Sequence, residues 1–522
     1  MSILTAVTIV HLTPAQALHR GVAAHNEGNL HDAEACYRAI LKSHKKKSAG
    51  SQTLDVIAQC YINLGILLHG KGDLKETINC YRSALKIRPD FVEIYWLKGL
   101  ARRDMGDLKL SIDCYQQAVK LEPNNADAHN NLGAALQHKG DLEGSIQSYR
   151  KALKIDPACV EAYNNMGGAL QGLGDTGEAL ESYKQALKIK PDYANAYINM
   201  GCILQDTGNL EAAIDCYKNA IKIMPGSTQA HNNMGNALKG LGNYEKALEH
   251  FDYISATVIN PSDPQFWFNS KSLALECLYF LGRYAELEQR LNVLANSGET
   301  NLRIAAVSAF VTNQLGLADP YPFCKNPLDF FHAGNLNNHV ADVSRFAEAL
   351  MLEAANENAV WEPQHGVTRS GFQTSPTIFG AGKNCQALER ILRKEIESYH
   401  SKFKSEDCDY MKSWPAKYDI RGWFVRLLKT GYQQAHNHPS GWLSGVVYLK
   451  TIDSSDTDEG SIELGLHGHD LPILDDSYAR KIHHPKVGDI ILFPSSLFHR
   501  TIPFSEDTER CVIAFDIYRY IN

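Results

Sequence analysis

The chain has 522 residues, of which 44% are hydrophobic and 21% are charged, and its formal net charge is −7 at pH 7. This composition is ordinary for globular proteins and excludes wholesale disorder and collagen-like or low-complexity architecture. The mild acidity argues against a nucleic-acid-binding protein, and no segment approaches the ~20 apolar residues of a membrane span. We therefore expect neither nucleic acid nor a membrane as a partner.

Residues 14–301 carry a pattern that repeats every 34 residues. The repeated glycines are Gly65, Gly99, Gly133, Gly167, Gly201 and Gly235, and a second set follows seven residues behind. The repeated aromatic residues are Tyr81, Tyr115, Tyr149, Tyr183, Tyr217 and Phe251. The pattern resembles the tetratricopeptide repeat, in which every unit is a helix pair. We expect about eight pairs, the first with an insertion near residues 45–51 and the last degenerate.

Twelve cysteines are spread over the chain without a CxxC pair. Those that directly precede a repeat tyrosine are Cys36, Cys80, Cys114 and Cys216. They are expected to serve as small, semi-buried side chains. This usage is typical of a reducing compartment, so the predicted location is the cytoplasm.

An asparagine recurs two residues before the first glycine of most repeats. The row consists of Asn63, Asn131, Asn165, Asn199 and Asn233, and Leu97 interrupts it. Asparagine is a mediocre helix former, so helix stability does not explain it, whereas its amide can both donate to and accept from a peptide backbone. The row resembles the asparagine ladder of O-GlcNAc transferase, which holds extended polypeptide, and this implies a peptide-binding groove. The alternative is consensus drift within a duplicated array.

The last third of the chain has no 34-residue period. Helices are expected over 338–356 and 385–403, followed by strands over 423–428, 443–449, 461–464, 489–493 and 510–517. Short β-rich segments punctuated by Gly, Pro and Asp predict a double-stranded β-helix, or jelly roll, which the helices would buttress. The expected organisation is an all-α tetratricopeptide-repeat superhelix over 14–301, a connecting segment over 302–324 and the jelly-roll domain over 325–522.

Two histidine-bearing segments of this last region carry the candidate chemistry. His436 and His438 stand just before the strand at 443–449. Residues two apart on a strand face the same side, so both can meet one metal ion. His499 follows about 60 residues later, which is enough chain to cross a barrel and supply a third ligand.

The arrangement resembles the Fe(II)- and 2-oxoglutarate-dependent oxygenases over about residues 325–522. In that family an HxD/E pair and a distal His hold iron and leave three positions for cosubstrate and O2. The resemblance implies a dioxygenase that uses Fe(II), 2-oxoglutarate and O2. It also implies that Arg510, eleven residues after His499, binds the far carboxylate of 2-oxoglutarate and that Tyr448 assists it.

One position departs from the family pattern, because His438 stands where the carboxylate is expected. Two ligand sets stay open. Either all three imidazoles bind the metal, which still suits Fe(II), or His436 and His499 bind it with water or a distant carboxylate. His467 and His469 also have ligand spacing, but their Gly-rich stretch favours a loop.

Arg510 has a structural alternative as well. Three acidic residues, Glu506, Asp507 and Glu509, precede it closely enough for an ion pair across neighbouring strands. In that case its charge would stabilise the sheet and would say nothing about a cosubstrate.

Together these features predict an Fe(II)- and 2-oxoglutarate-dependent dioxygenase that hydroxylates a protein or peptide recruited by the repeats. One alternative is an oxygenase that acts on a small molecule while the repeats serve assembly. A second is an interaction scaffold whose oxygenase-like domain has lost activity, for which the missing carboxylate argues. A third is a different metal-dependent barrel enzyme, which the spacing of Arg510 argues against.

Overall fold

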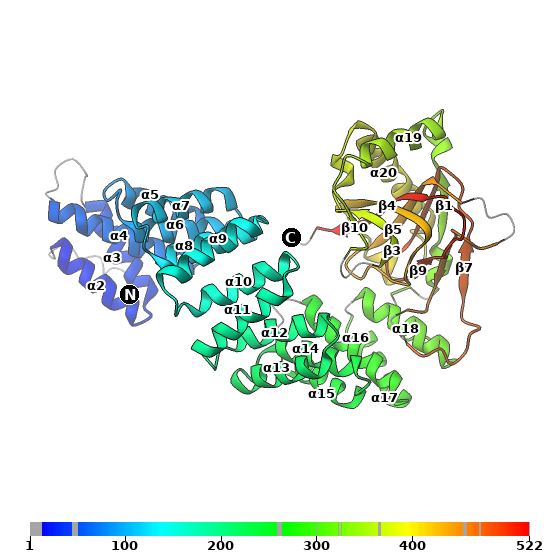
Figure 1. Ribbon diagram of the computed structural model, residues 1–522, viewed down its shortest axis with the longest axis horizontal. Helices are drawn as coiled ribbons and strands as arrows, with labels where there is room; N and C mark the ends of the chain where they lie inside the picture. The colour runs from blue at the N-terminus through cyan, green and yellow to red at the C-terminus, as the bar shows by residue number, and fades with distance from the viewer. Residues whose placement is uncertain are drawn as a thin grey trace. The chain divides into compact units, whose positions relative to one another are not determined.

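The computed structural model describes residues 13–43, 51–257, 264–298, 300–321, 323–324, 326–363, 367–452, 457–468 and 471–520. The chain divides into two compact units, Met1–Asn233 and Met234–Asn522, and the boundary lies within helix α14 (Thr228–Gly240). The described part of the first unit is helical, and the second contains the last repeat helices and the strands (Figure 1). This arrangement, an all-α repeat array followed by a β-rich domain, confirms the predicted fold class.

The repeat array consists of consecutive helix pairs (Figure 1). In the first unit the helices are α2 (Pro14–Asn26), α3 (Leu30–Ser43), α4 (Ser51–Gly70), α5 (Leu74–Leu85), α6 (Val92–Asp104), α7 (Leu108–Leu121), α8 (Ala126–Lys139), α9 (Leu142–Ile155), α10 (Val160–Gly172), α11 (Thr176–Ile189), α12 (Ala194–Asp206) and α13 (Leu210–Ile223). In the second unit α14 is followed by α15 (Tyr244–Thr257), α16 (Pro264–Phe280) and α17 (Tyr284–Asn296). Most of the predicted insertion, residues 44–50, lies outside the described residues.

Close helix packing explains the first glycine set. In the repeat formed by α10 and α11, a Cβ added to Gly167 would lie 2.6 Å from Cε1 of Tyr183, whose ring is fully buried. The matching glycines of the other repeats face their aromatic residue in the same way. The absence of a Cβ therefore creates the space that the ring fills.

The second glycine set forms the turn inside each repeat. Gly174 has φ +84°, a left-handed conformation that strains any residue with a Cβ. The next residue, Asp175, caps α11 by accepting a hydrogen bond from the backbone N–H of Glu178. Both ends of this turn are thus determined by residue types that are visible in the sequence.

We expect Gly167→Ala to lower the free energy of unfolding by about 1–3 kcal/mol, because the new methyl group overpacks the contact with Tyr183. Gly177→Ala, on the exposed side of α11, is the matched control, since its Cβ would meet nothing closer than 3.8 Å. That change should stabilise the helix by up to about 1 kcal/mol. Urea unfolding followed by circular dichroism measures both variants, and equal midpoints would contradict the packing explanation.

Helix α18 (Leu302–Gln314) lies within the predicted connecting segment and packs against α16 in the second unit. Most of its side chains are buried, among them Ile304, Phe310 and Val311. The first half of the connecting segment is therefore a buried helix. The domain limits at 301 and 325 stay a prediction.

The β-rich domain contains two antiparallel sheets. A seven-stranded sheet has the order β1-β8-β5-β10-β4-β3-β2, and a three-stranded sheet has the order β7-β6-β9. The strands are β1 (His332–Asn335), β2 (Ala359–Trp361), β3 (Thr368–Thr374), β4 (Tyr418–Gln433), β5 (Leu443–Lys450), β6 (Ile462–Gly465), β7 (Arg480–His483), β8 (Asp489–Pro494), β9 (Phe498–Thr501) and β10 (Arg510–Arg519). A shared core joins the sheets, with Val446, Phe493 and Val512 from the larger one and Ile462 and Leu464 from the smaller.

The five predicted strands correspond to β4, β5, β6, β8 and β10, and the two predicted helices to α19 (Val343–Ala354) and α20 (Lys383–Phe403). The strands that were not predicted are three to seven residues long, and β2 is exposed throughout. Short polar strands lack the apolar alternation on which sequence prediction depends. The remaining short helices are η1 (Pro327–Phe330), η2 (Leu336–Asn338), η3 (Ile378–Gly380) and α21 (Asp409–Lys412).

Within the second unit, the last helices hold a segment that follows β6. The hydroxyl of Tyr279 in α16 donates to the carbonyl of Pro472 at 2.9 Å. The amide of Gln314 in α18 donates to the carbonyl of Asp475 at 2.8 Å and accepts from the N–H groups of Leu474 and Asp475 at 2.6 and 2.9 Å. Because β6 pairs with β9, these contacts support the part of the barrel that carries His499.

Candidate functional site

Three imidazoles meet inside the β-rich domain. His436 and His438 lie in the loop between β4 and β5, and His499 lies in β9. One ring nitrogen of each lies within 4.8 Å of a ring nitrogen of the other two. The ring centroids are 4.2 Å apart for His436 and His499, 5.0 Å for His436 and His438, and 5.1 Å for His438 and His499. The structure thus brings together the three residues that were predicted as ligands.

The backbone holds this cluster in register. His436 and His499 exchange two backbone hydrogen bonds, of 3.0 and 2.9 Å, in an isolated antiparallel bridge. The N–H of His438 donates to the carbonyl of Ser495 at 3.0 Å. The first two histidines are therefore positioned by a loop that is anchored on His499 and on Ser495 before it, rather than by a continuous strand.

A carboxylate that sequence reasoning missed lies behind His438. Asp516 in β10 is 1% exposed, and it accepts a hydrogen bond from Nδ1 of His438 at 2.5 Å. Ser444 and Tyr518 donate to the same carboxylate at 2.6 and 3.1 Å. Because a carboxylate only accepts, Nδ1 of His438 is the donor of this hydrogen bond, and a neutral imidazole with its proton on Nδ1 has its lone pair on Nε2. A lone acid inside an apolar strand was the signal that could have identified Asp516.

Burial favours the neutral form of two imidazoles, those of His436 and His499. It lowers the pKa of His436 to about 4 and the pKa of His499 well below the usual value, and the neighbouring imidazoles lower both further. Nε2 of His438 is buried without a hydrogen-bond partner in the structure. Neutral imidazole is the form that binds a metal, so these side chains can serve as ligands near pH 7.

Arg510 and Tyr448 form a second polar group inside the barrel. Arg510 is 1% exposed, and its guanidinium carbon lies 5.1 Å from the ring centroid of Tyr448 in the neighbouring strand β5. Nε and Nη1 of Arg510 and the hydroxyl of Tyr448 are buried without partners. Burial lowers the pKa of Arg510 and raises the pKa of Tyr448 to about 12. Buried donors without acceptors are costly, so this group fits an anionic occupant.

The ion-pair alternative for Arg510 is not observed among the described residues. Glu509 instead pairs with Arg426 at 2.6 Å and with Lys450 at 3.1 Å. Glu506 and Asp507 are exposed, whereas Arg510 is buried.

His467, which also had ligand spacing in the sequence, is engaged elsewhere. Nε2 of His467 lies 2.9 Å from the carbonyl of Leu471, and its ring packs on Phe310. His469 lies outside the described residues. Among the described residues, the cluster with metal-ligand geometry is that of His436, His438 and His499.

The asparagine row is half-buried along the first helices of the repeats. Nδ2 of Asn165 donates to Oδ1 of Asn130 at 3.2 Å, and Nδ2 of Asn199 donates to Oδ1 of Asn164 at 3.1 Å. Nδ2 of Asn233 lies 3.2 Å from Sγ of Cys202. These contacts link neighbouring repeats. Each uses one donor of the side-chain amide, which has two donor hydrogens and an acceptor with two lone pairs, so part of the hydrogen-bonding capacity of the row is left over.

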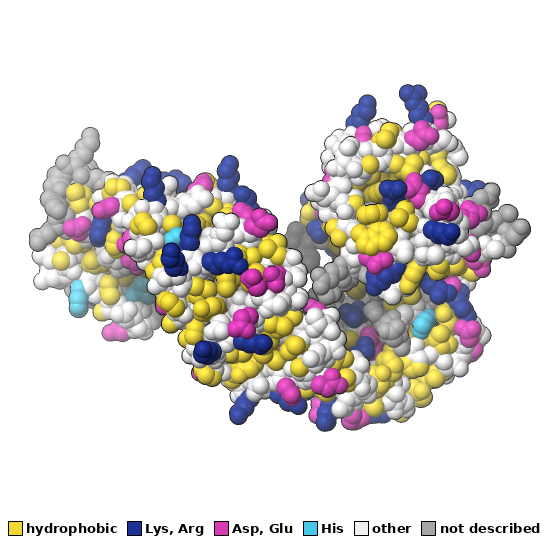
Figure 2. Space-filling view, in the orientation of Figure 1, with side chains coloured by type: hydrophobic (Ala, Val, Ile, Leu, Met, Phe, Trp, Pro, Cys, Tyr) yellow, Lys and Arg dark blue, Asp and Glu magenta, His cyan; other side chains and the backbone are white. Residues whose placement is uncertain are grey.

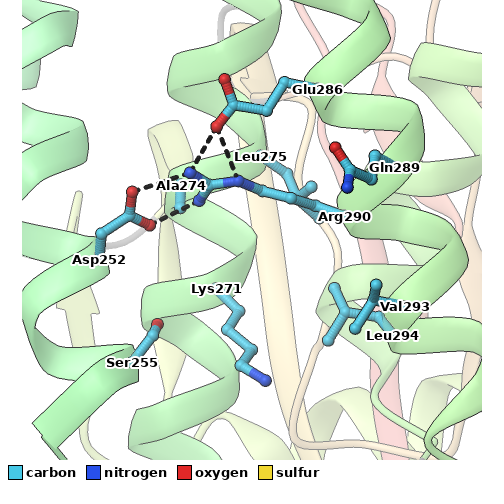
Figure 3. Close-up of a pocket in the computed structure, with 10 residues that line it drawn as sticks. All are labelled: Asp252, Ser255, Lys271, Ala274, Leu275, Glu286, Gln289, Arg290, Val293 and Leu294. Atoms are coloured by element: carbon cyan, nitrogen blue, oxygen red, sulfur yellow. Dashed lines mark hydrogen bonds and ion pairs between the residues drawn. The ribbon is translucent and has the colours of Figure 1, made fainter.

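A pocket of about 390 Å³ lies among α15, α16 and α17, at the end of the array (Figure 3). Its central cation, Arg290, points at Asp252 from α15 and is bound by it at 2.5 and 2.8 Å (Figure 3). Glu286 accepts from the same guanidinium at 2.6 Å. The charge of Arg290 is thus balanced by acidic side chains of the pocket itself. We therefore interpret the pocket as part of the packing between the helices and not as a site for an ion.

The visible face of the molecule shows Lys and Arg side chains interspersed with Asp and Glu (Figure 2).

Among the described helices, none combines the length and the apolar composition that crossing a bilayer requires.

Protein-family models match both the repeats and the β-rich domain. The family described as "Putative 2OG-Fe(II) oxygenase" matches residues 421–516, a range that includes the three histidines, Tyr448, Arg510 and Asp516. Models of the tetratricopeptide repeat match residues 65–102 and 99–140, 124–192 and 159–226, and 228–252. No curated protein matches the chain.

Three solved structures illustrate the likeness of part of this chain to known proteins. The crystal structure of MamA has 26% identity and a TM-score of 0.29, and the match covers 31% of this chain and 94% of MamA. YrrB, described as a TPR protein with an unusual peptide-binding site, has 24% identity and a TM-score of 0.28 over 33% of this chain and 89% of its own. A tetratricopeptide repeat protein from Parabacteroides merdae has 15% identity and a TM-score of 0.42, over 50% of this chain and 97% of its own. From the family matches, the chain is a tetratricopeptide-repeat protein with a carboxyl-terminal domain of the family described as "Putative 2OG-Fe(II) oxygenase".

Proposed function

We propose that this protein is an Fe(II)- and 2-oxoglutarate-dependent dioxygenase that hydroxylates a protein or peptide recruited by its repeats. The observation that carries the proposal is the cluster of three imidazoles, whose ring nitrogens lie within 4.8 Å of one another inside a domain of the matching family. Fe(II) and 2-oxoglutarate, when bound, would supply the oxidising chemistry, in which one oxygen atom of O2 enters succinate as 2-oxoglutarate loses CO2 and the other enters the hydroxyl group of the substrate. The protein's residues bind, orient and shield these reactants.

His436, His438 and His499 fit a divalent transition metal by their donor set. Imidazole nitrogen suits Fe, Zn, Cu and Ni, and three ligands on one side leave positions open for other molecules. Nε2 of His438 is buried without a partner, and a metal ion would satisfy it. This favours the three-imidazole ligand set over the set with two histidines.

Arg510 and Tyr448 fit the far carboxylate of 2-oxoglutarate. Their buried donors without partners match an acceptor with two oxygens, and the planar guanidinium suits bidentate binding. Asp516 and Arg510 are six residues apart on β10, so both face the same side of the strand. The proposed cosubstrate group and the residue behind His438 therefore line the same face of the large sheet.

We expect Arg510→Ala to weaken 2-oxoglutarate binding about ten- to a hundredfold, because a charge-assisted hydrogen bond contributes about 1.5–3 kcal/mol. Metal affinity should stay unchanged, since Arg510 lies outside the histidine cluster. Protein prepared without oxygen and loaded with Fe(II) is titrated with 2-oxoglutarate, and succinate release is then measured in air. Glu509→Gln is the matched control, because Glu509 pairs with Arg426 and Lys450 at the surface. An unaltered titration in Arg510→Ala would contradict the cosubstrate assignment.

The same titration separates the proposal from its alternatives. A scaffold with an inactive domain would release no succinate at any 2-oxoglutarate concentration. A small-molecule oxygenase would release succinate, and its activity would be independent of the asparagine row. The peptide-hydroxylase proposal requires both succinate release and dependence on the repeats for substrate binding.

A further inference from the structure

The carboxylate of Asp516 is buried, and no Lys or Arg among the described residues pairs with it. Its ion-pair partner among the described residues is His438. Arg421, its cross-strand neighbour on β4, is exposed and pairs with Asp419 at 3.0 Å instead. Burying a carboxylate is expensive unless hydrogen bonds and a positive charge compensate for it. Ser444, Tyr518 and His438 provide the hydrogen bonds, but no permanent cation provides the charge.

The imidazole of His438 is held by contacts on two sides. Nδ1 donates to Asp516, and the indole of Trp423 stacks on the ring with centroids 5.5 Å apart and an interplanar angle of 14°. These contacts restrict both the rotation of the ring and its tautomer. Nε2, on the far side of the ring from Nδ1, is thereby left free of protein partners. In a neutral imidazole whose Nδ1 donates, Nε2 holds the lone pair, so Nε2 is the atom of His438 that can serve as a ligand.

We propose that Asp516 is a positioning residue that delivers to the metal, through the imidazole of His438, the negative charge that a carboxylate ligand delivers directly in HxD/E sites. This inference rests on the proposed metal site. A carboxylate that accepts from a ligating imidazole fixes its orientation and raises its basicity. The cation, in turn, provides the positive charge that the buried carboxylate lacks. His438 and Asp516 together thus replace the missing carboxylate. The negative charge of Asp516 then acts on the metal through the imidazole ring of His438 instead of by direct contact.

The test is a Co(II) titration of the metal-free full-length protein, followed by visible absorption of the bound Co(II). Asp516→Asn keeps the size of the side chain and removes its charge, and we expect Co(II) affinity to fall about 10–100-fold. The matched control is Asp489→Asn, which makes the same change in a histidine–aspartate pair away from the cluster, with His483 at 3.2 Å. This control should bind Co(II) as the wild type does.

The same change in the His438→Asp background distinguishes a charge effect from a structural one. There the carboxylate ligand is restored, so Asp516→Asn should leave Co(II) affinity unchanged or raise it by removing a like charge. The two His438→Asp proteins also keep the test valid if Asp516→Asn alone does not fold.

Four outcomes would overturn the inference. They are wild-type affinity in Asp516→Asn, the same loss in both backgrounds, the same loss in Asp489→Asn, and a His438→Asp protein that binds no Co(II). A wild-type protein that binds no Co(II) would instead reject the metal site itself.

Discussion

Replacing His499 by alanine is expected to abolish metal binding and, with it, succinate production. Changing a residue that merely orients a metal ligand already costs about 10–100-fold in affinity, so removing a ligand should cost more than about a hundredfold. His499 is the histidine of the cluster that is buried, and its backbone bridge to His436 does not need its side chain. Metal analysis after anaerobic loading with Fe(II) measures the effect, and full occupancy in His499→Ala would reject the assignment.

Two further variants define the ligand set. His436→Ala should behave as His499→Ala does, because both imidazoles belong to either candidate set. His438→Ala separates the sets, since unaltered activity in this variant would leave the site with two histidines. The unfolding midpoint of the repeats should be the same in all three variants, because the cluster lies in the β-rich domain. A shifted midpoint would indicate a change in folding rather than in metal binding.

Replacing Asn131, Asn165, Asn199 and Asn233 together by alanine is expected to weaken polypeptide binding by about 2–6 kcal/mol. Four neutral hydrogen bonds contribute about 0.5–1.5 kcal/mol each, so a single substitution would have little effect. The helices should persist, because alanine is the better helix former. The bonds from Asn165 to Asn130 and from Asn199 to Asn164 are lost as well, so a lower unfolding midpoint accompanies the change. Metal loading and substrate-free turnover of 2-oxoglutarate should be normal.

The matched control replaces four exposed amides on second helices of the same unit, Gln116, Gln117, Gln147 and Asn219, by alanine. Polypeptides recovered from a cell extract are compared among wild type, the asparagine variant and this control, at equal helicity. Recovery should fall in the asparagine variant alone. Equal recovery in all three proteins would reject the peptide groove and favour an oxygenase that acts on a small molecule.

The parts of the fold that were predictable share a local signature. The contact between Gly167 and Tyr183 has an equivalent in the other repeats, where a glycine again leaves the space that an aromatic ring fills. The two residue types therefore recur at a fixed spacing, and this periodicity alone predicts the helix pairs. Strands such as β5 and β10 are long enough for an apolar pattern to identify them. By contrast, β2 is fully exposed, so it has no apolar pattern to detect.

The candidate site divides in the same way. His436, His438, His499 and Arg510 were identifiable because their residue types and spacing along the chain resemble those of a known family. The sequence left open whether Arg510 pairs with a nearby acid, and the structure shows Glu509 bound to Arg426 and Lys450 instead. Burial decided this point, because only a buried guanidinium without an acidic partner requires an anion from elsewhere.

By itself, then, the sequence determined the repeat array and the β-rich class of the last third, and it identified the three histidines as candidate ligands, because each depends on spacing along the chain. The tertiary structure alone decided the bridge between His436 and His499 and the carboxylate of Asp516 behind His438. These contacts join residues 63 and 78 positions apart, which strand pairing brings together. Spacing along a chain carries no information about such pairs until the register of the sheet is known, since a shift of one residue would turn Asp516 away from His438.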